Sequence, residues 1–263
     1  MNNNDQTAGQ TTQTQPEWHH TDSSRPPMTC GRISRYLKGE GRGALLGHIG
    51  TVVGATLLYY GIVLVLNVLV DALVPYTLFG VLLGDLLSII LGILFGVLEY
   101  GLISIYMNLQ YGQMARFTDL FIGFQENSNK IIIIQAILIL IETACMLPAS
   151  LASLFASGTT GWIAAALLLA AGYVLAFFFN ILFALSLYIL LDYPDMPWKD
   201  VLKRSVSLMK GYKKYYLYLE LSFLPLYLLS VLTLGVAAIL VSAYEQSTLA
   251  AFYKGRMENR LMG

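Results

Sequence analysis

The stretch ETACMLPASLASLFASGTTGWIAAALLLAAGYVLAFFFNILFALSLYILLD, residues 142–192, decides the fold of this chain. Between its acidic ends, Glu142 and Asp192, no Lys, Arg, Asp or Glu occurs over 49 consecutive positions. Crossing about 30 Å of hydrocarbon takes roughly 20 apolar residues in an α-helix. The stretch is therefore long enough for two such helices, and the small-residue run Ser157–Gly161 between them predicts a turn.

The basic residues indicate how the rest of the chain is arranged. All sixteen Lys and Arg fall into four clusters: Arg25, Arg32, Arg35, Lys38 and Arg42; Arg116 and Lys130; Lys199, Lys203, Arg204, Lys210, Lys213 and Lys214; and Lys254, Arg256 and Arg260. Basic residues are retained on the cytoplasmic side of a membrane. The spacing predicts that the chain returns to the same face after each pair of helices, with both termini cytoplasmic.

We therefore expect an all-α fold, a polytopic transmembrane helical bundle of about six spans, arranged as three hairpins with interfacial amphipathic helices between them. The expected spans are residues 44–70, 86–110, 131–155, 162–191, 215–233 and 236–253. The last apolar block is one helix or two. An even number of crossings favours two short helices that meet at Thr233–Gly235, because a single helix would leave the last basic cluster outside. Residues 1–30 are expected to form a disordered polar cytoplasmic tail, residues 31–255 the transmembrane domain, and residues 256–263 a short cytoplasmic tail.

The composition excludes several classes of protein. Apolar residues make up 56% of the chain and charged residues 12%, against about 45–50% and about 25% in soluble domains. The sequence has no basic stripe on a soluble domain, which is the feature that would indicate nucleic-acid binding. Cys30 and Cys145 would lie in different environments, so we expect two free thiols rather than a disulfide. The sequence also lacks a Cys/His cluster that would predict a metal site, and we expect no cofactor.

One connecting segment has a helical amphipathic pattern. From Trp198 to Tyr212 apolar residues recur at three- and four-residue steps, with basic residues on the other face. The candidate anionic-lipid contacts of this region are Lys199, Lys203, Arg204, Lys210, Lys213 and Lys214. Such a helix lies in the membrane interface or packs on the bundle as a connector, and the sequence leaves both alternatives open. A weaker pattern of the same kind covers residues 114–124.

Small residues recur four positions apart, at Gly43/Gly47, Gly50/Gly54, Gly80/Gly84 and Gly92/Gly96. In lipid such pairs let helix backbones approach closely. They favour packing within the chain, and a homodimer through the Gly-rich helix faces is the alternative.

The most pointed residues are four acids within expected spans, Glu99, Glu142, Glu220 and Glu245. No Lys or Arg within a span is available to pair with them, and an ionised carboxylate in hydrocarbon is costly. Intramembrane carboxylates commonly mark proton or cation pathways, so one hypothesis is a shared polar cavity. Further candidates for its lining are Asn67, Asn108, Gln110, Gln135 and Asn180. The alternative is that these acids reach water at the inner interface or are protonated and bonded to a neighbouring helix.

Signatures of enzymes are absent from the sequence. It has no GxSxG, no HExxH and no GxxxxGK[ST] motif. We therefore expect no catalytic residue and a protein that is not an enzyme.

The C-terminal third resembles a known family. The segments concerned are Ile189-Leu190-Leu191-Asp192-Tyr193-Pro194, Ser205-Val206-Ser207-Leu208-Met209-Lys210-Gly211-Tyr212-Lys213, Leu219-Glu220-Leu221-Ser222-Phe223, and then Tyr244, Thr248, Ala250, Phe252 and Tyr253. This succession resembles an uncharacterised family of bacterial, mainly Gram-positive, polytopic integral membrane proteins, catalogued as a domain of unknown function. The resemblance implies the bacterial cytoplasmic (plasma) membrane and no established reaction. Pro225-Leu226 and Ala243 depart from the pattern of that family.

Two functions are compatible with these features. The first is a non-enzymatic membrane component that binds membrane lipids or a membrane-protein partner in envelope maintenance or export. The second is a transporter or permease subunit that uses the intramembrane carboxylates for proton or cation coupling.

Overall fold

The computed structural model describes residues 29–74, 78–154, 158–233 and 235–258, and the regular elements in these ranges are helical. In chain order they are α1 (Cys30–Leu45), α2 (Ile49–Leu73), α3 (Leu78–Gln110), the 3-10 helix η1 (Phe117–Phe121), α4 (Ile122–Gln125), α5 (Ser128–Leu154), α6 (Gly158–Phe183), α7 (Ser186–Asp192), α8 (Trp198–Met209), α9 (Lys213–Leu221), α10 (Leu224–Val231) and α11 (Val236–Met257). The tail at residues 1–28 lies outside the described residues, as do Arg260 and most of the expected C-terminal tail.

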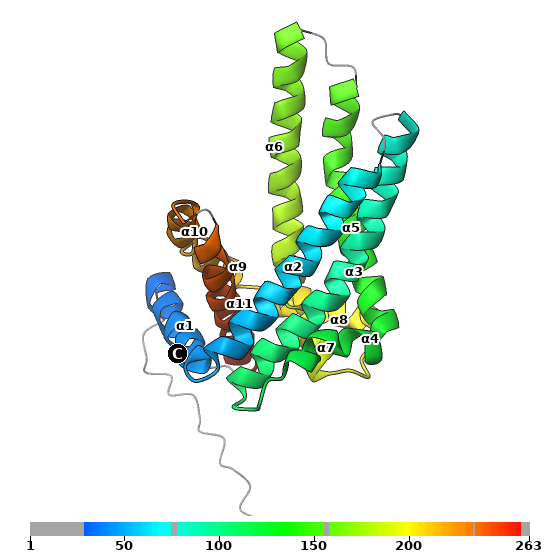
Figure 1. Ribbon diagram of the computed structural model, residues 1–263. Coiled ribbons are helices and arrows are strands. Elements are labelled where there is room, and N and C mark those ends of the chain that lie inside the picture. The colour runs from blue at the N-terminus through cyan, green and yellow to red at the C-terminus, as the bar shows by residue number, and fades with distance from the viewer. Residues whose placement is uncertain (1–28, 75–77, 155–157, 234, 259–263) are drawn as a thin grey trace, which may run out of the picture.

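Four helical segments are long and apolar enough to cross a membrane. They are Ile49–Leu73, Leu86–Gln110, Ser128–Ser153 and Gly158–Asp192. In Figure 1 these segments extend from one end of the molecule, where the short helices α4, α7 and α8 gather. Their outer sides carry large apolar residues such as Leu64, which is 65% exposed, and Val174, which is 71% exposed. Apolar surface on this scale requires hydrocarbon rather than water. The expectation of an all-helical membrane protein is thus confirmed.

The first expected span, 44–70, is wrong at its start. Residues 30–45 form a separate helix, α1, and α2 begins only at Ile49. Gly47 lies between them with φ 98°, in the left-handed region that favours glycine. The chain therefore changes direction where the sequence predicted a continuous helix.

Two further expected spans are interrupted. The fourth, 162–191, is divided into α6 and α7 by a turn at Ala184–Leu185. The fifth, 215–233, is divided into α9 and α10 by a turn at Ser222–Phe223.

The last apolar block consists of separate helical arms rather than one helix. The arms α10 and α11 meet at Gly235, which has φ 86°. The Thr233 hydroxyl oxygen accepts a hydrogen bond from the Ala237 N–H at 3.0 Å and so satisfies one of the first N–H groups of α11. The turn thus lies within the expected Thr233–Gly235 segment.

The amphipathic segment at 198–212 forms α8, which packs on the bundle. Val201, Ser205 and Met209 follow one face of α8 and are fully buried, and α8 contacts α6 and α7. Gly211, with φ 81°, ends this segment as the sequence predicts. The apolar side of α8 therefore faces protein, as in the connector alternative, while Lys199, Lys203 and Lys210 stay exposed.

Basic side chains bind the carbonyl groups at the ends of other helices. Lys254 Nζ donates to Gln110 O, at the end of α3, at 2.5 Å. Arg256 Nε and Nη2 donate to Leu208 O, near the end of α8, at 3.3 Å and 3.0 Å. The last carbonyls of a helix lack partners within it and carry partial negative charge, so a cation stabilises them. The final helix, α11, thus holds the ends of two earlier helices.

Candidate functional site

The four acids predicted as a cluster line one cavity, although each lies on a different helix. Glu99 is on α3, Glu142 on α5, Glu220 on α9 and Glu245 on α11. The cavity has a volume of about 510 Å³. Glu142 is exposed, whereas the other three acids are half-buried. The structure therefore brings together residues separated by up to 146 positions in the chain.

Close packing of α3 on α5 shapes one wall of this cavity, which we call the carboxylate cavity. A Cβ atom at Gly96 would lie 2.3 Å from Cγ and Cδ of Gln135, and one at Gly92 would lie 3.0 Å from Ile139 Cδ1. The Gln135 and Ile139 side chains therefore occupy the space that a larger residue at these positions would need. The Gly92/Gly96 pair thus packs within the chain and brings Gln135 to the cavity wall.

A second part of the lining is acidic and aromatic. Glu220 and Tyr216 of α9 line the cavity together with Glu245 of α11. The Tyr227 hydroxyl donates a hydrogen bond to Glu245 Oε2. A carboxylate oxygen accepts this bond, so Tyr227 fixes the position of the Glu245 side chain.

Amide side chains complete the polar lining. Asn180 and Gln135 line the cavity as expected, and Gln246, which the sequence did not single out, lies beside them. Asn67, Asn108 and Gln110 are not part of the lining. Gln110 instead donates to Ser247 O at 3.0 Å in the base of the bundle, and Asn67 donates to Val63 O at 2.8 Å.

The carboxylate cavity has no cationic side chain in its described lining, because none of the lining residues is Lys, Arg or His. Carboxylates that share a cavity lining without basic residues attract protons or other cations. Lys38, which lies outside this lining, interacts electrostatically with Glu245. Within the described ranges, no group of three or more His, Cys, Asp and Glu residues is arranged to hold a metal ion.

A model of the family described as "Protein of unknown function (DUF975)" matches residues 34–260, from α1 to beyond the end of α11. The chain belongs to this family. No curated protein and no solved structure matches the chain. The expected membership of an uncharacterised family is thus confirmed.

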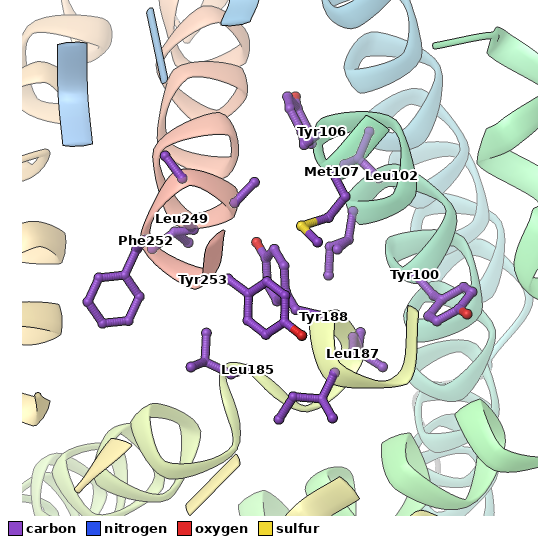
Figure 2. Close-up of a cluster of buried hydrophobic side chains, with 14 of the residues drawn as sticks. Tyr100, Leu102, Tyr106, Met107, Leu185, Leu187, Tyr188, Leu249, Phe252 and Tyr253 are labelled. Carbon is purple, nitrogen blue, oxygen red and sulfur yellow. The ribbon is translucent and has the colours of Figure 1, made fainter. Parts of the chain in front are cut away.

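Three of the segments that carry the DUF975 resemblance contact one another. The Tyr253 hydroxyl donates to Asp192 Oδ2 at 2.7 Å, which joins the first and last of these segments. The ring of Tyr253 lies 5.5 Å from that of Tyr188, a cavity-lining residue, between α11 and α7 (Figure 2). Phe223 and Tyr244 join the third and last segments with ring centroids 5.3 Å apart.

The candidate anionic-lipid contacts are spread over two surfaces. Lys203, Arg204 and Lys210 line one groove beside α8, together with Asp200. The other three lie outside its described lining: Lys199 lies over the Trp198 ring at 5.3 Å and Lys213 over the Phe178 ring at 4.9 Å, while Lys214 is exposed. Their role in lipid binding stays a prediction.

The remaining small-residue pairs have different environments. An added Cβ would meet nothing within 4 Å at Gly43, Gly47 or Gly50, whereas at Gly54 it would lie 2.7 Å from the Phe117 ring. At Gly84 it would lie 3.4 Å from Val74, and the side-chain environment of Gly80 lies outside the described residues. A homodimer through these faces stays a prediction.

The sequence reasoning missed the helix α1 and its basic face. Ile33, Leu37 and Gly41 recur every four residues and are buried, a period that would have revealed an amphipathic helix. On another face lies Lys38, whose Nζ donates to Ser222 O at 2.9 Å. Burial lowers the pKa of the Lys38 ammonium, and the negative charge of Glu245 opposes this shift.

Proposed function

We propose that this DUF975 protein is a transporter or permease subunit that takes up protons or organic cations in the carboxylate cavity. The observation that supports this most is the convergence of Glu99, Glu142, Glu220 and Glu245 on one cavity whose described lining has no basic residue. Carboxylates in a membrane interior are costly, so a role as cation ligands accounts for their presence together in a lining without basic residues. The protein is then not an enzyme, since transport requires no bond to be made or broken.

The size of the carboxylate cavity supports the organic cation. About 510 Å³ is far more than a proton path requires and falls within the range of small-molecule sites. The aromatic residues Phe177, Tyr188 and Tyr216 in its lining would contact the apolar part of such a ligand. Glu220 and Glu245, which line the same cavity, would release or accept a proton as the cation enters or leaves.

For the topology we propose six crossings, with both termini on the cytoplasmic side of a bacterial plasma membrane. The described basic residues lie on α1, in the connection before η1, on the first turn of α5, on α8 and the turn after it, on the first turn of α9, and on the last turns of α11. These segments lie at one end of the bundle (Figure 1). Basic residues are retained on the cytoplasmic side of a membrane, so we assign this end to the cytoplasm.

The test is a flux measurement on purified protein in liposomes that contain a pH-sensitive dye. Under an imposed potential we expect proton flux that falls at least tenfold in Glu142→Gln and vanishes when all four acids are replaced by Gln. The matched control is Glu40→Gln, because Glu40 is an exposed acid of α1 that lies outside the carboxylate cavity. Binding of tetraphenylphosphonium in detergent provides a second readout of the same four acids. Flux and binding that are both unchanged in the fourfold variant would contradict the proposal, as would their absence in the wild type.

A second candidate function is non-enzymatic binding of lipid or a partner protein, in envelope maintenance or export. It is supported by the exposed basic face of α8, where Lys203, Arg204 and Lys210 line one groove. The test is retention of anionic lipid by the purified protein after these three residues are replaced by Gln. Retention equal to that of the wild type would remove the motivation for this candidate.

A further inference from the structure

A basic cup on α1 opens onto an apolar groove at the edge of the bundle. The cup has a volume of about 690 Å³ and is lined on one side by α1 and on the other by Tyr218, Ser222 and Tyr244. The groove is lined almost entirely by aliphatic residues of α1, α2 and α11. Arg42, Leu46 and Tyr244 line both hollows, so the cup and the groove are continuous.

The charge of the cup is strongly positive. Arg35, Lys38 and Arg42 follow each other at three- and four-residue steps and therefore lie on the same side of α1. No Asp or Glu is among the residues that line the cup. Across the described ranges, no hydrogen bond or ion pair engages the guanidinium of Arg35 or of Arg42. These two groups keep their donors for a ligand.

The polar groups around these cations suit a phosphate ester. The hydroxyl oxygens of Ser34 on α1 and Ser222 in the turn after α9 lie 3.3 Å apart. Lys38 Nζ uses one donor on Ser222 O and lies 4.2 Å from the Phe223 ring centroid, which holds the ammonium in the wall of the cup. The α1 side is bare at Gly39, where an added Cβ would meet nothing within 4 Å. An anion is therefore able to approach the α1 backbone directly.

The groove offers an apolar surface beside the cup, and a free phosphate ion would have no use for that surface. Leu46 is 64% exposed and Ile49 is 50% exposed, and both line the groove at the start of α2. With Val52, Val53 and Leu240 they form an apolar track that begins at Arg42. A molecule that fills both hollows has an anionic head and a hydrocarbon chain joined end to end.

We propose that this cup and groove form a binding site for one anionic phospholipid, with its phosphate against Arg35, Lys38 and Arg42 and an acyl chain between α2 and α11. The site is separate from the groove beside α8 and does not depend on the carboxylate cavity. Juxtamembrane cations attract anionic lipid at about 1 kcal/mol per residue near the surface.

The experiment titrates detergent-purified protein with dioleoyl phosphatidylglycerol or dioleoyl phosphatidylcholine and counts bound lipids by native mass spectrometry. Replacing Arg35 and Arg42 together by Gln should weaken phosphatidylglycerol binding about 30-fold, which is about 2 kcal/mol. Lys38 is left unchanged because it binds Ser222 O within the fold. The matched control replaces Arg32 and Arg116 by Gln, which removes the same charge from two exposed residues outside the lining of the cup.

A second variant separates loss of lipid from loss of fold. In Gly39→Glu the new carboxylate meets no neighbour within 4 Å at its Cβ and lies four residues after Arg35 and three before Arg42. It should strengthen the helix and still lower phosphatidylglycerol binding at least tenfold. Equal binding of phosphatidylcholine, equal loss in the variant without Arg32 and Arg116, or unchanged binding in both α1 variants would overturn the proposal. Competition by inorganic phosphate or glycerol phosphate at the same concentration as the lipid would also overturn it, because the site would then bind a free anion.

Discussion

Replacing Gly101 by alanine is expected to destabilise the junction between α3 and η1. A Cβ atom at Gly101 would lie 1.9 Å from Leu120 O, 2.4 Å from Leu120 C and 2.8 Å from Leu120 Cα. Nonbonded contact with a carbon normally begins near about 3.5 Å, so η1 would have to move by roughly 1.5 Å. The obstacle is backbone, which is unable to rotate away as the end of a flexible side chain would. Leu120 is also fully buried, so its displacement would disturb the core at the base of the bundle.

The magnitude follows from two opposing effects. Overpacking of a close contact costs typically about 1–3 kcal/mol, and a clash with backbone belongs at the upper end of that range. Alanine in place of glycine within a helix recovers about 1 kcal/mol. We therefore expect a net loss of about 2 kcal/mol, which lowers the melting temperature of a domain of this size by roughly 4–8 °C.

The assay is thermal unfolding of wild type and variants in one detergent, followed by tryptophan fluorescence. Gly39→Ala is the matched control, because Gly39 is also helical and an added Cβ there meets nothing within 4 Å. The control should keep or raise the melting temperature. Equal melting temperatures for Gly101→Ala and Gly39→Ala would refute the reasoning, since the clash would then have no energetic consequence.

Three further predictions concern other contacts. Arg256→Lys should lower the free energy of unfolding by about 1–3 kcal/mol. The guanidinium donates two hydrogen bonds to Leu208 O and stacks on the Tyr212 ring, and a lysine cannot do both. Thermal unfolding measures this loss, and an unchanged melting temperature would contradict the prediction. Tyr253→Phe removes the hydrogen bond to Asp192 and should cost about 1 kcal/mol in the same assay, whereas a stabilising effect would show that this bond contributes nothing. Under the proposed topology, an impermeant maleimide should label Cys30 in inside-out vesicles and not in intact cells, with Cys30→Ser as the control for Cys145. Labelling of Cys30 in intact cells would reverse the proposed orientation.

Much of the helical architecture could be predicted from the sequence because bilayer thickness constrains helix length. The apolar runs at 86–110 and 131–155 correspond closely to candidate spans of the structure. The amphipathic period of 198–212 correctly predicted α8. What the sequence did not reveal were the interruptions at Ala184–Leu185 and Ser222–Phe223. Apolar residues continue through the first interruption, so nothing local marks it. Pro225, in the first turn of α10, is a local signal for the second that the expected continuous span overlooked.

The sequence predicted the individual acids of the candidate site, but it left open whether they would line one cavity. Each of the four acids could be assigned to an apolar run, yet their meeting depends on how α3, α5, α9 and α11 pack, which no local pattern encodes. Asn67 and Gln110 have the same polar character as Asn180 and point elsewhere. The partners of the acids, Tyr216 and Tyr227, were missed because a tyrosine near a membrane surface has an ordinary role as an interfacial anchor.

The hold of α11 on earlier helices has a consequence for biogenesis. Until Lys254 and Arg256 emerge from the ribosome, the exposed carbonyls at the ends of α3 and α8 have only water or lipid headgroups as partners. Closure of the base therefore waits for the last turns of α11, and a nascent chain cut short before Lys254 would present an unfinished surface to quality-control proteases. Such a truncation would then deplete the cell of protein whose helices α1 to α10 are all intact.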